Sequence, residues 1–198
     1  MAARNRWGLW LAAVSLVGTA LLAAAPAAQT PLVVRDLDGV AHTPLVPAPG
    51  TVSLLFFITV DCPISNRYAP EITRIIADYA PRRVHAWLVY ADSSLTPDRV
   101  RAHVGDFYPG TTTPAVIDRT HALTAAVGAT VTPEAVVYTA AGRAYRGRID
   151  DWYISLSQNR RAPADHTLRL ALDAVLAGRP VAVRDTQPIG CYIPKDLP

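Results

Sequence analysis

The sequence contains little cysteine: Cys62 and Cys191 are the only two in 198 residues. They lie too far apart in the chain for a local metal-binding knuckle, whose ligands are separated by only a few residues. No cysteine follows the apolar N-terminal segment closely, which argues against a lipid-modified N-terminus. We therefore expect neither a resident metal nor a cofactor.

The sequence also lacks any concentration of charge of one sign. The formal net charge is +3, and the basic residues are scattered along the chain. Proteins that bind nucleic acids usually carry a basic patch or stripe, so we expect no nucleic-acid partner. Internal repeats are absent as well, which excludes solenoid and propeller architectures.

The first thirty residues have the order of a secretory signal peptide. Arg4 and Arg6 precede an apolar run from Leu9 to Ala25, which ends in small residues. We expect residues 1–27 to be cleaved and the mature protein to be exported, periplasmic or extracellular, with no membrane segment left. A permanent anchor is the alternative, because the run approaches the length of a spanning helix.

The remaining chain, about 170 residues, suits one compact domain. We place this domain at residues 31–178 and an extended tail at 179–198. The tail has four prolines and no hydrophobic periodicity, so it should run extended over the surface, and it carries Cys191. In an exported protein its thiol can pair with that of Cys62 and stay paired.

Apolar strands alternate with amphipathic helices along the domain. The nearly continuous apolar run at 51–60 is typical of a strand buried on both faces. A hairpin should precede it, with strands at 32–35 and 40–43 around a turn at Asp38-Gly39. Further strands are expected at 84–90, 115–117, 135–138 and 145–149, and helices from near Ser65 to 80, at 97–103, at 122–127 and around 168–175. This order predicts an α/β fold.

Cys62 follows the central strand directly and stands where the next helix begins. The unpaired N–H groups and the positive dipole end of a helix N-terminus stabilise a thiolate, which is the nucleophilic form of cysteine. The neighbouring charge of Asp61 opposes this unless its side chain caps the helix or faces away. The alternative is a buried, inert cysteine.

The stretch from Phe57 to Ser65, followed by Ala69-Pro70, resembles the active-site segment of the thioredoxin-like superfamily. The resemblance implies a thioredoxin-like fold, with a central mixed sheet flanked by helices, an N-terminal hairpin and an extended C-terminal tail. It places Cys62 at the attacking cysteine and Ser65 where the second cysteine of the C-x-x-C motif usually stands. The resemblance also implies that Pro63, beside the thiol, contacts the substrate.

A second segment, Val131-Thr132-Pro133-Glu134, resembles the family's loop with a cis-proline beside the thiol. Pro133 would be that proline, and Thr132 would offer its backbone to an extended substrate peptide. An ordinary trans proline opening a strand is the alternative. The segment 145–151 and the pair Gly190-Cys191 resemble a redoxin-type subgroup of exported bacterial proteins, related to alkyl hydroperoxide reductases and thiol-specific antioxidants.

These features predict a thiol–disulfide oxidoreductase of the cell envelope. Cys62 would attack a disulfide, and Cys191 would resolve the mixed disulfide, because Ser65 cannot. The partners would be protein thiols or disulfides, with an electron donor that the sequence does not name. A permanent Cys62–Cys191 bond would instead be a structural staple.

Two other functions stay open. Thr59 precedes Cys62 by three residues, as in the T-x-x-C core of peroxiredoxins, which implies a thiol peroxidase with a peroxide substrate. However, Leu55 replaces that family's proline, and Thr132 stands where an activating arginine is expected, so a substitute would have to come from Arg143, Arg146 or Arg148.

The other alternative is a copper-delivery protein, in which Cys62, Cys191 and His121 would converge on Cu(I). A single histidine on a helix is more typical of a surface or core position. The segment Asp150 to Tyr153 could line a substrate groove, although such a segment is also typical of a helix cap and a packed loop.

Overall fold

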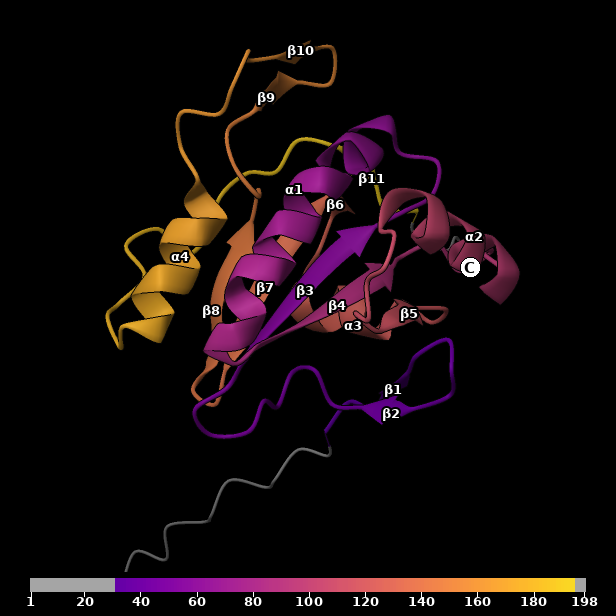
Figure 1. The fold of residues 1–198 in the computed structure, drawn as a ribbon, viewed down its shortest axis with the longest axis horizontal. Coiled ribbons are helices and arrows are strands. Elements are labelled where there is room, and N and C mark those ends of the chain that lie inside the picture. Colours follow the sequence, from indigo (N-terminus) through magenta and orange to yellow (C-terminus); the bar gives the residue numbers. More distant parts are fainter. Residues whose placement is uncertain (1–30, 195–198) are drawn as a thin grey trace, which may run out of the picture. The chain divides into compact units, whose positions relative to one another are not determined.

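The computed structural model describes residues 31–194, drawn in colour in Figure 1. The predicted signal peptide at 1–27 and the last four residues of the chain lie outside the described residues. Among residues 31–194, no helix is long and apolar enough to cross a membrane.

The domain is built on a five-stranded mixed sheet with the strand order β5-β4-β3-β7-β8. The first three of these strands are parallel, and β7 and β8 run antiparallel to β3 and to each other. This arrangement confirms the α/β fold with a central mixed sheet. The strands span β3 Val52–Ile58, β4 Val84–Tyr90, β5 Ala115–Ile117, β7 Glu134–Thr139 and β8 Gly142–Gly147.

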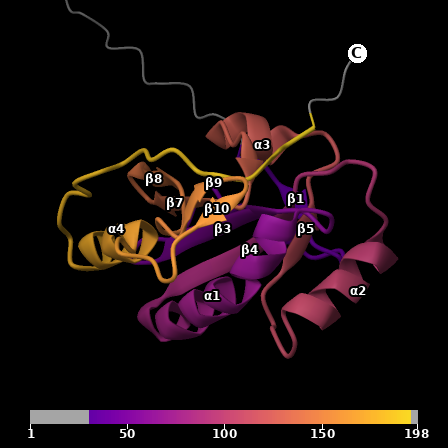
Figure 2. The ribbon, with the colours of Figure 1, turned by 90° about the horizontal axis from the view of Figure 1, so that it is seen from above.

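Helices cover both faces of the sheet (Figure 2). On one face lie α1 and α4, and α3 lies on the other. The sequence dictates this layering, because all seven residues of β3 are buried and alternate between the two sides. Leu54 and Phe56 belong to one core cluster, and Leu55 and Phe57 to the other. The helices span α1 Pro63–Tyr79, α2 Pro97–Phe107, α3 Ala122–Val127 and α4 Thr167–Leu176, with a 3₁₀ turn η1 at Ala80–Arg82.

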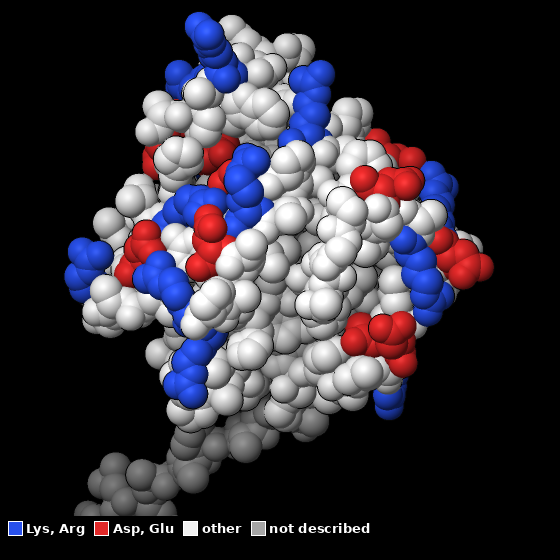
Figure 3. All heavy atoms as spheres, in the orientation of Figure 1, with Lys and Arg blue, Asp and Glu red and all other residues white. Residues whose placement is uncertain are grey.

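Opposite charges are interspersed on the face shown in Figure 3. Arg169 of α4 pairs with Glu71 at 3.0 Å and with Asp78 at 2.7 Å, and both acids belong to α1. Arg82, just after α1, pairs with Asp173 of α4 at 2.7 Å. These partly exposed pairs align α4 with α1 while adding little stability each.

The expected N-terminal hairpin is present as β1 Val34–Arg35 and β2 Ala41–His42, which pair antiparallel. Gly39 in its turn has a φ of 81°, a conformation that favours glycine. Several predicted boundaries differ: α2 ends at Phe107 rather than at 103, β8 spans Gly142–Gly147 rather than 145–149, and α1 begins at Pro63 rather than near Ser65. Proline suits the first helical position, since its missing N–H would have no partner there.

Two short antiparallel pairs were not expected from the sequence. The strands β9 Tyr153–Ser155 and β10 Gln158–Asn159 form a hairpin beyond the end of β8 (Figure 1). The second pair joins β6 Val131–Thr132 to β11 Cys191–Tyr192, in the C-terminal tail. Strands of two residues carry no detectable periodicity, so only the assembled chain shows this pairing.

Candidate active site

Cys62 is the N-cap residue of α1. Its Sγ accepts a hydrogen bond from the backbone N–H of Ser65 at 3.4 Å, where serine, threonine or aspartate usually provides an oxygen. The side chain is 0% exposed. The sulfur of Cys62 therefore lies against the N-terminal N–H groups of α1 and has no open path to solvent.

The loop before β7 lies against this thiol. The Thr132–Pro133 peptide bond is cis, as the sequence-based interpretation of Pro133 implies. The Cys62 thiol donates a hydrogen bond to the carbonyl oxygen of Thr132 at 3.2 Å. Two segments 70 residues apart in the chain thus meet at one sulfur atom.

Glu134 holds this loop, a role that sequence reasoning missed. Its carboxylate is buried and accepts hydrogen bonds from the N–H groups of Thr130, at 2.8 Å, and Val131, at 3.5 Å. Arg146 of β8 lies 3.6 Å from the same carboxylate. Burial raises the pKa of Glu134 above its ordinary value, and these partners partly offset the rise. The signal available in the sequence was the acidic residue directly after Thr132-Pro133.

The C-terminal tail brings the second cysteine to the same place. In the β6–β11 pair Cys191 stands opposite Thr132, and Ile193 adds a backbone hydrogen bond to Thr130 at 3.0 Å. Gly190 packs so closely that a Cβ there would lie 2.0 Å from the Thr132 oxygen. The tail strand can approach the loop this closely only because residue 190 has no side chain.

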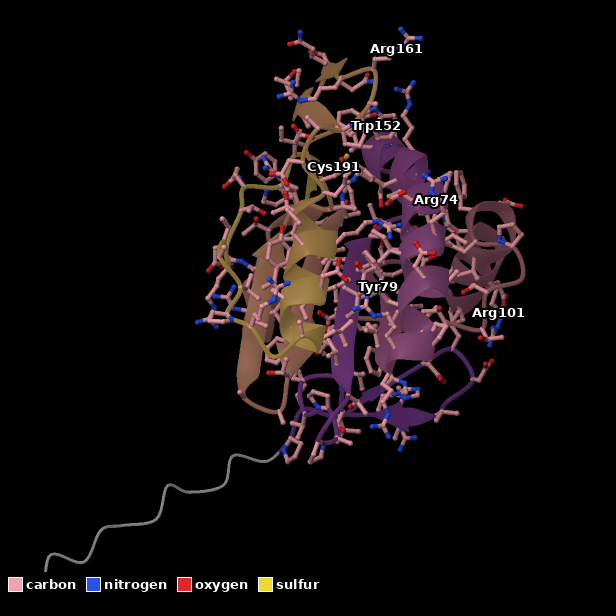
Figure 4. All side chains as sticks on the ribbon, turned by 60° about the vertical axis from the view of Figure 1, so that its left-hand side comes forward. Arg74, Tyr79, Arg101, Trp152, Arg161 and Cys191 are labelled. Atoms are coloured by element: carbon pink, nitrogen blue, oxygen red, sulfur yellow. The ribbon has the colours of Figure 1, made fainter. Side chains whose placement is uncertain are left out.

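Cys191 is partly exposed and lies beside Cys62, and both residues are free thiols in this structure. Burial, followed by hydrogen bonding and charge from Cys62, raises the pKa of the Cys191 thiol to about 12. A thiolate is therefore disfavoured at Cys191. Figure 4 shows Cys191 at the same end of the molecule as Trp152 and Arg161, near the β9–β10 hairpin.

The other predicted site residues lie around the two thiols or just outside. Ser65 is buried in the first turn of α1, and its Oγ has no hydrogen-bond partner among the described residues. Pro63 is exposed at the start of the helix, and Thr59 is half-buried just past the end of β3. None of these placements by itself assigns a catalytic role.

The charge of Asp61 is directed away from the thiol. Its carboxylate pairs with Arg99 of α2 at 2.7 Å, and its side chain is 68% exposed. The helix cap is Cys62 itself, so Asp61 does not cap the helix. Asp61 instead faces away from the thiol, which reduces its opposition to a thiolate. Solvent and the guanidinium screen this charge.

The chain matches no family model and no curated protein. Among solved structures, it is similar to an uncharacterised conserved protein from Geobacillus kaustophilus. The two are 25% identical with a TM-score of 0.72, over 85% of this chain and 91% of that one. A hypothetical protein from Sinorhizobium meliloti is 26% identical with a TM-score of 0.69, over 83% and 90%.

A third similar structure carries a described activity. It is a secreted disulfide oxidoreductase of Mycobacterium tuberculosis homologous to Escherichia coli DsbE, 17% identical, with a TM-score of 0.51 over 74% of this chain and 95% of that one. The fold is thioredoxin-like.

A buried acid–aromatic cluster adjoins the cis-proline of this thioredoxin-like fold. Asp150 accepts hydrogen bonds from the Tyr68 hydroxyl at 2.5 Å and from the N–H of Trp152 at 2.9 Å. Burial raises the pKa of Asp150. A cavity of about 30 Å³ between Tyr68, Asp150 and Pro133 has room for water but not for a substrate. The segment from Asp150 is a packed loop leading into β9, not an open groove.

The ligands of the copper alternative do not converge in the part of the chain that the structure describes. Among residues 31–194, no three histidine, cysteine or acidic side chains gather as metal ligands. The Nε2 atom of His121 lies 2.9 Å from the carbonyl oxygen of Ala91, in a separate contact from the two thiols. The three arginines considered for peroxide activation are engaged in ion pairs: Arg143 with Asp185, Arg146 with Glu134 and Asp185, and Arg148 with Asp165.

Proposed function

We propose that this protein is a thiol–disulfide oxidoreductase that cycles between two thiols and a Cys62–Cys191 disulfide. The observation that carries the proposal is the β6–β11 pairing, which puts Cys191 opposite Thr132, the residue whose carbonyl binds the Cys62 thiol. A redox pair is thereby formed from residues about 130 positions apart. Ser65 fills the place of a nearby resolving cysteine and cannot serve as one.

The exchange balances in two steps. Two substrate thiols reduce the internal disulfide, giving one substrate disulfide and the two protein thiols. Two electrons and two protons pass to the protein, and the reverse reaction oxidises it. When the internal disulfide opens, Cys62, at the N-terminus of α1, leaves as a thiolate, and in the reverse reaction it attacks as one.

We also propose that the protein works outside the cytoplasm. The N-terminal order of basic, apolar and small residues supports export. The secreted Mycobacterium tuberculosis disulfide oxidoreductase with this fold is consistent with such a location. Protein thiols or disulfides of the cell envelope would then be the substrates.

The proposal is tested by non-reducing peptide mapping of the mature protein across redox buffers. We expect a Cys62–Cys191 crosslink that forms and opens reversibly at a potential above about −300 mV, the range of exchangeable rather than structural disulfides. Cys62→Ser and Cys191→Ser should each abolish the crosslink. Each should also lower turnover of a model disulfide at least tenfold, on the order of 1.4 kcal/mol of transition-state stabilisation.

Three results would contradict the proposal. A crosslink that resists reduction identifies a structural staple. Full turnover in Cys191→Ser removes Cys191 from the mechanism. Two free thiols, with peroxide-dependent sulfenic acid on Cys62, would indicate a thiol peroxidase instead.

A further inference from the structure

The two sulfurs differ in their access to solvent. Cys62 is 0% exposed, whereas Cys191 lies on a short edge strand and is partly exposed. The residue after it, Tyr192, is 83% exposed. An external thiol that approaches the folded protein therefore meets the tail strand before it meets Cys62.

The same strand occupies the backbone edge that an extended substrate would need. Thr132 and Val131 pair with Cys191 and Tyr192, and Thr130 accepts the hydrogen bond from Ile193. Gly190 fills the space directly against the Thr132 carbonyl. A substrate peptide cannot pair with β6 while the tail is in place, because the tail already pairs with that edge.

We infer, building on the proposed function, that substrate thiols enter at Cys191 and not at Cys62. A substrate thiolate attacks the Cys191 sulfur of the internal disulfide, a new bond forms between them, and Cys62 leaves as a thiolate. A second substrate thiolate then attacks the substrate sulfur of this mixed disulfide, releasing the substrate disulfide and the Cys191 thiolate. Cys62 and Cys191 each take up one proton. The order is opposite to the one expected from the sequence, in which Cys62 meets the substrate.

The electrostatics of the two thiols agree with this order. The better leaving group in thiol–disulfide exchange is the sulfur whose thiolate is more stable. Cys62 has the N–H of Ser65 at 3.4 Å and the positive end of α1, both of which stabilise an anion. Cys191 has neither, and burial raises the pKa of its thiol. In the first step, the contacts of Cys62 with the N-terminus of α1 therefore favour its expulsion from the internal disulfide.

The inference also fixes the class of substrate. The attacking thiol must reach a sulfur at the surface without adding a strand to β6. Low-molecular-weight thiols meet that condition, and so do cysteines on flexible protein segments. Cysteines that are presented only within an extended, strand-pairing peptide do not.

The test uses the oxidised wild-type protein and reduced glutathione as the probe. Samples are quenched with acid and N-ethylmaleimide at early times, and the cysteine peptides are mapped by mass. We expect glutathione on Cys191 and maleimide on Cys62, with the Cys191 adduct at least tenfold in excess. Glutathione mainly on Cys62, or equally on both, would overturn the inference.

A second comparison tests the substrate class. The oxidised protein is reduced by glutathione and, separately, by an extended cysteine peptide of high strand propensity at the same thiolate concentration. We expect the peptide to react no faster than glutathione, and a preference for the peptide above tenfold would overturn the inference. Failure of the proposed function has a different result, because no reversible Cys62–Cys191 disulfide would form at all.

Discussion

At the scale of single residues, the site depends on how Cys62 is bonded. Its sulfur accepts one hydrogen bond, from the N–H of Ser65, and donates one, to the carbonyl of Thr132. The accepted bond favours a thiolate, and the donated bond exists only in the thiol or is replaced when the sulfur forms a disulfide. The hydrogen bond from Cys62 to the Thr132 carbonyl is therefore lost when Cys62 forms a disulfide, because the sulfur then has no proton to donate.

Glu134 allows a prediction at this scale. Glu134→Ala should lower the free energy of unfolding by about 1–3 kcal/mol, because the buried N–H groups of Thr130 and Val131 lose their acceptor. Glu134→Gln retains an amide oxygen that can accept and should cost clearly less. Urea denaturation of the reduced proteins measures both. Equal costs for the two variants would show that charge, not hydrogen bonding, holds the loop.

The pH dependence of Glu134→Gln follows from the pKa shift. Because the pKa of Glu134 is raised in the folded state, the folded protein binds more protons than the unfolded chain between the two values. The wild-type protein thus loses stability as pH rises through this window, whereas the glutamine variant does not. The variant should gain stability relative to wild type from pH 4.5 upward, and a gain on acidification would contradict this account.

At the scale of elements, the short β6–β11 pair determines what Cys62 can reach. It has only two residues a side, and it depends on the close approach of Gly190 to Thr132. A side chain at Gly190 would meet backbone atoms, which cannot rotate away as a flexible side chain can. A substitution at Gly190 should therefore separate the tail strand from β6.

Gly190→Ala should displace the tail strand. Its Cβ would lie 2.0 Å from the Thr132 oxygen and 2.6 Å from the carbonyl carbon. We expect slower formation of the Cys62–Cys191 disulfide and at least tenfold faster alkylation of Cys62 by iodoacetamide in the reduced protein. Peptide mass mapping follows both, and far-ultraviolet circular dichroism confirms that the domain stays folded.

Gly105→Ala is the matched control for this substitution. Gly105 lies within α2, has an ordinary φ, and a Cβ there meets nothing within 4 Å. Alanine in a helix interior stabilises by up to about 1 kcal/mol relative to glycine. Both the crosslink and the alkylation rate should match wild type. Wild-type behaviour of Gly190→Ala itself would show that the tail does not cover Cys62.

At the scale of the whole molecule, the proposed disulfide closes a loop that includes most of the domain. About 130 residues separate the two cysteines, from the start of α1 to β11. A crosslink of that span restricts the unfolded chain more than the folded one. Redox state and folding stability are therefore coupled across the domain.

The oxidised protein should be more stable than the reduced protein by about 2–5 kcal/mol, the usual range for a disulfide. Urea denaturation of the two forms measures the difference, with oxidised and reduced Cys191→Ser samples as controls that should coincide. A difference near zero would mean that forming the bond strains the folded state by as much as it restricts the unfolded chain.

Local patterns in the sequence were enough to predict the layered α/β fold and the position of the first thiol. The continuous apolar run of β3 and the regular apolar spacing in the helices encode local structure, and the Cys62-Pro63 pair marks the start of α1. Pro133 and its loop could be recognised for the same reason, since their signal lies in adjacent residues. Each of these patterns lies in residues that are close together in the sequence.

The surroundings of the Cys62 thiol depend on contacts between distant segments, which no local pattern predicts. The pairing of β11 with β6, the burial of Cys62 beneath it and the support of the loop by Glu134 all join residues distant in the chain. The sequence predicted an extended tail that carries Cys191 but not which edge that tail would join, because a two-residue strand has no periodicity of its own. Backbone pairing and close packing against Thr132 fix its place, and these exist only once the domain has folded.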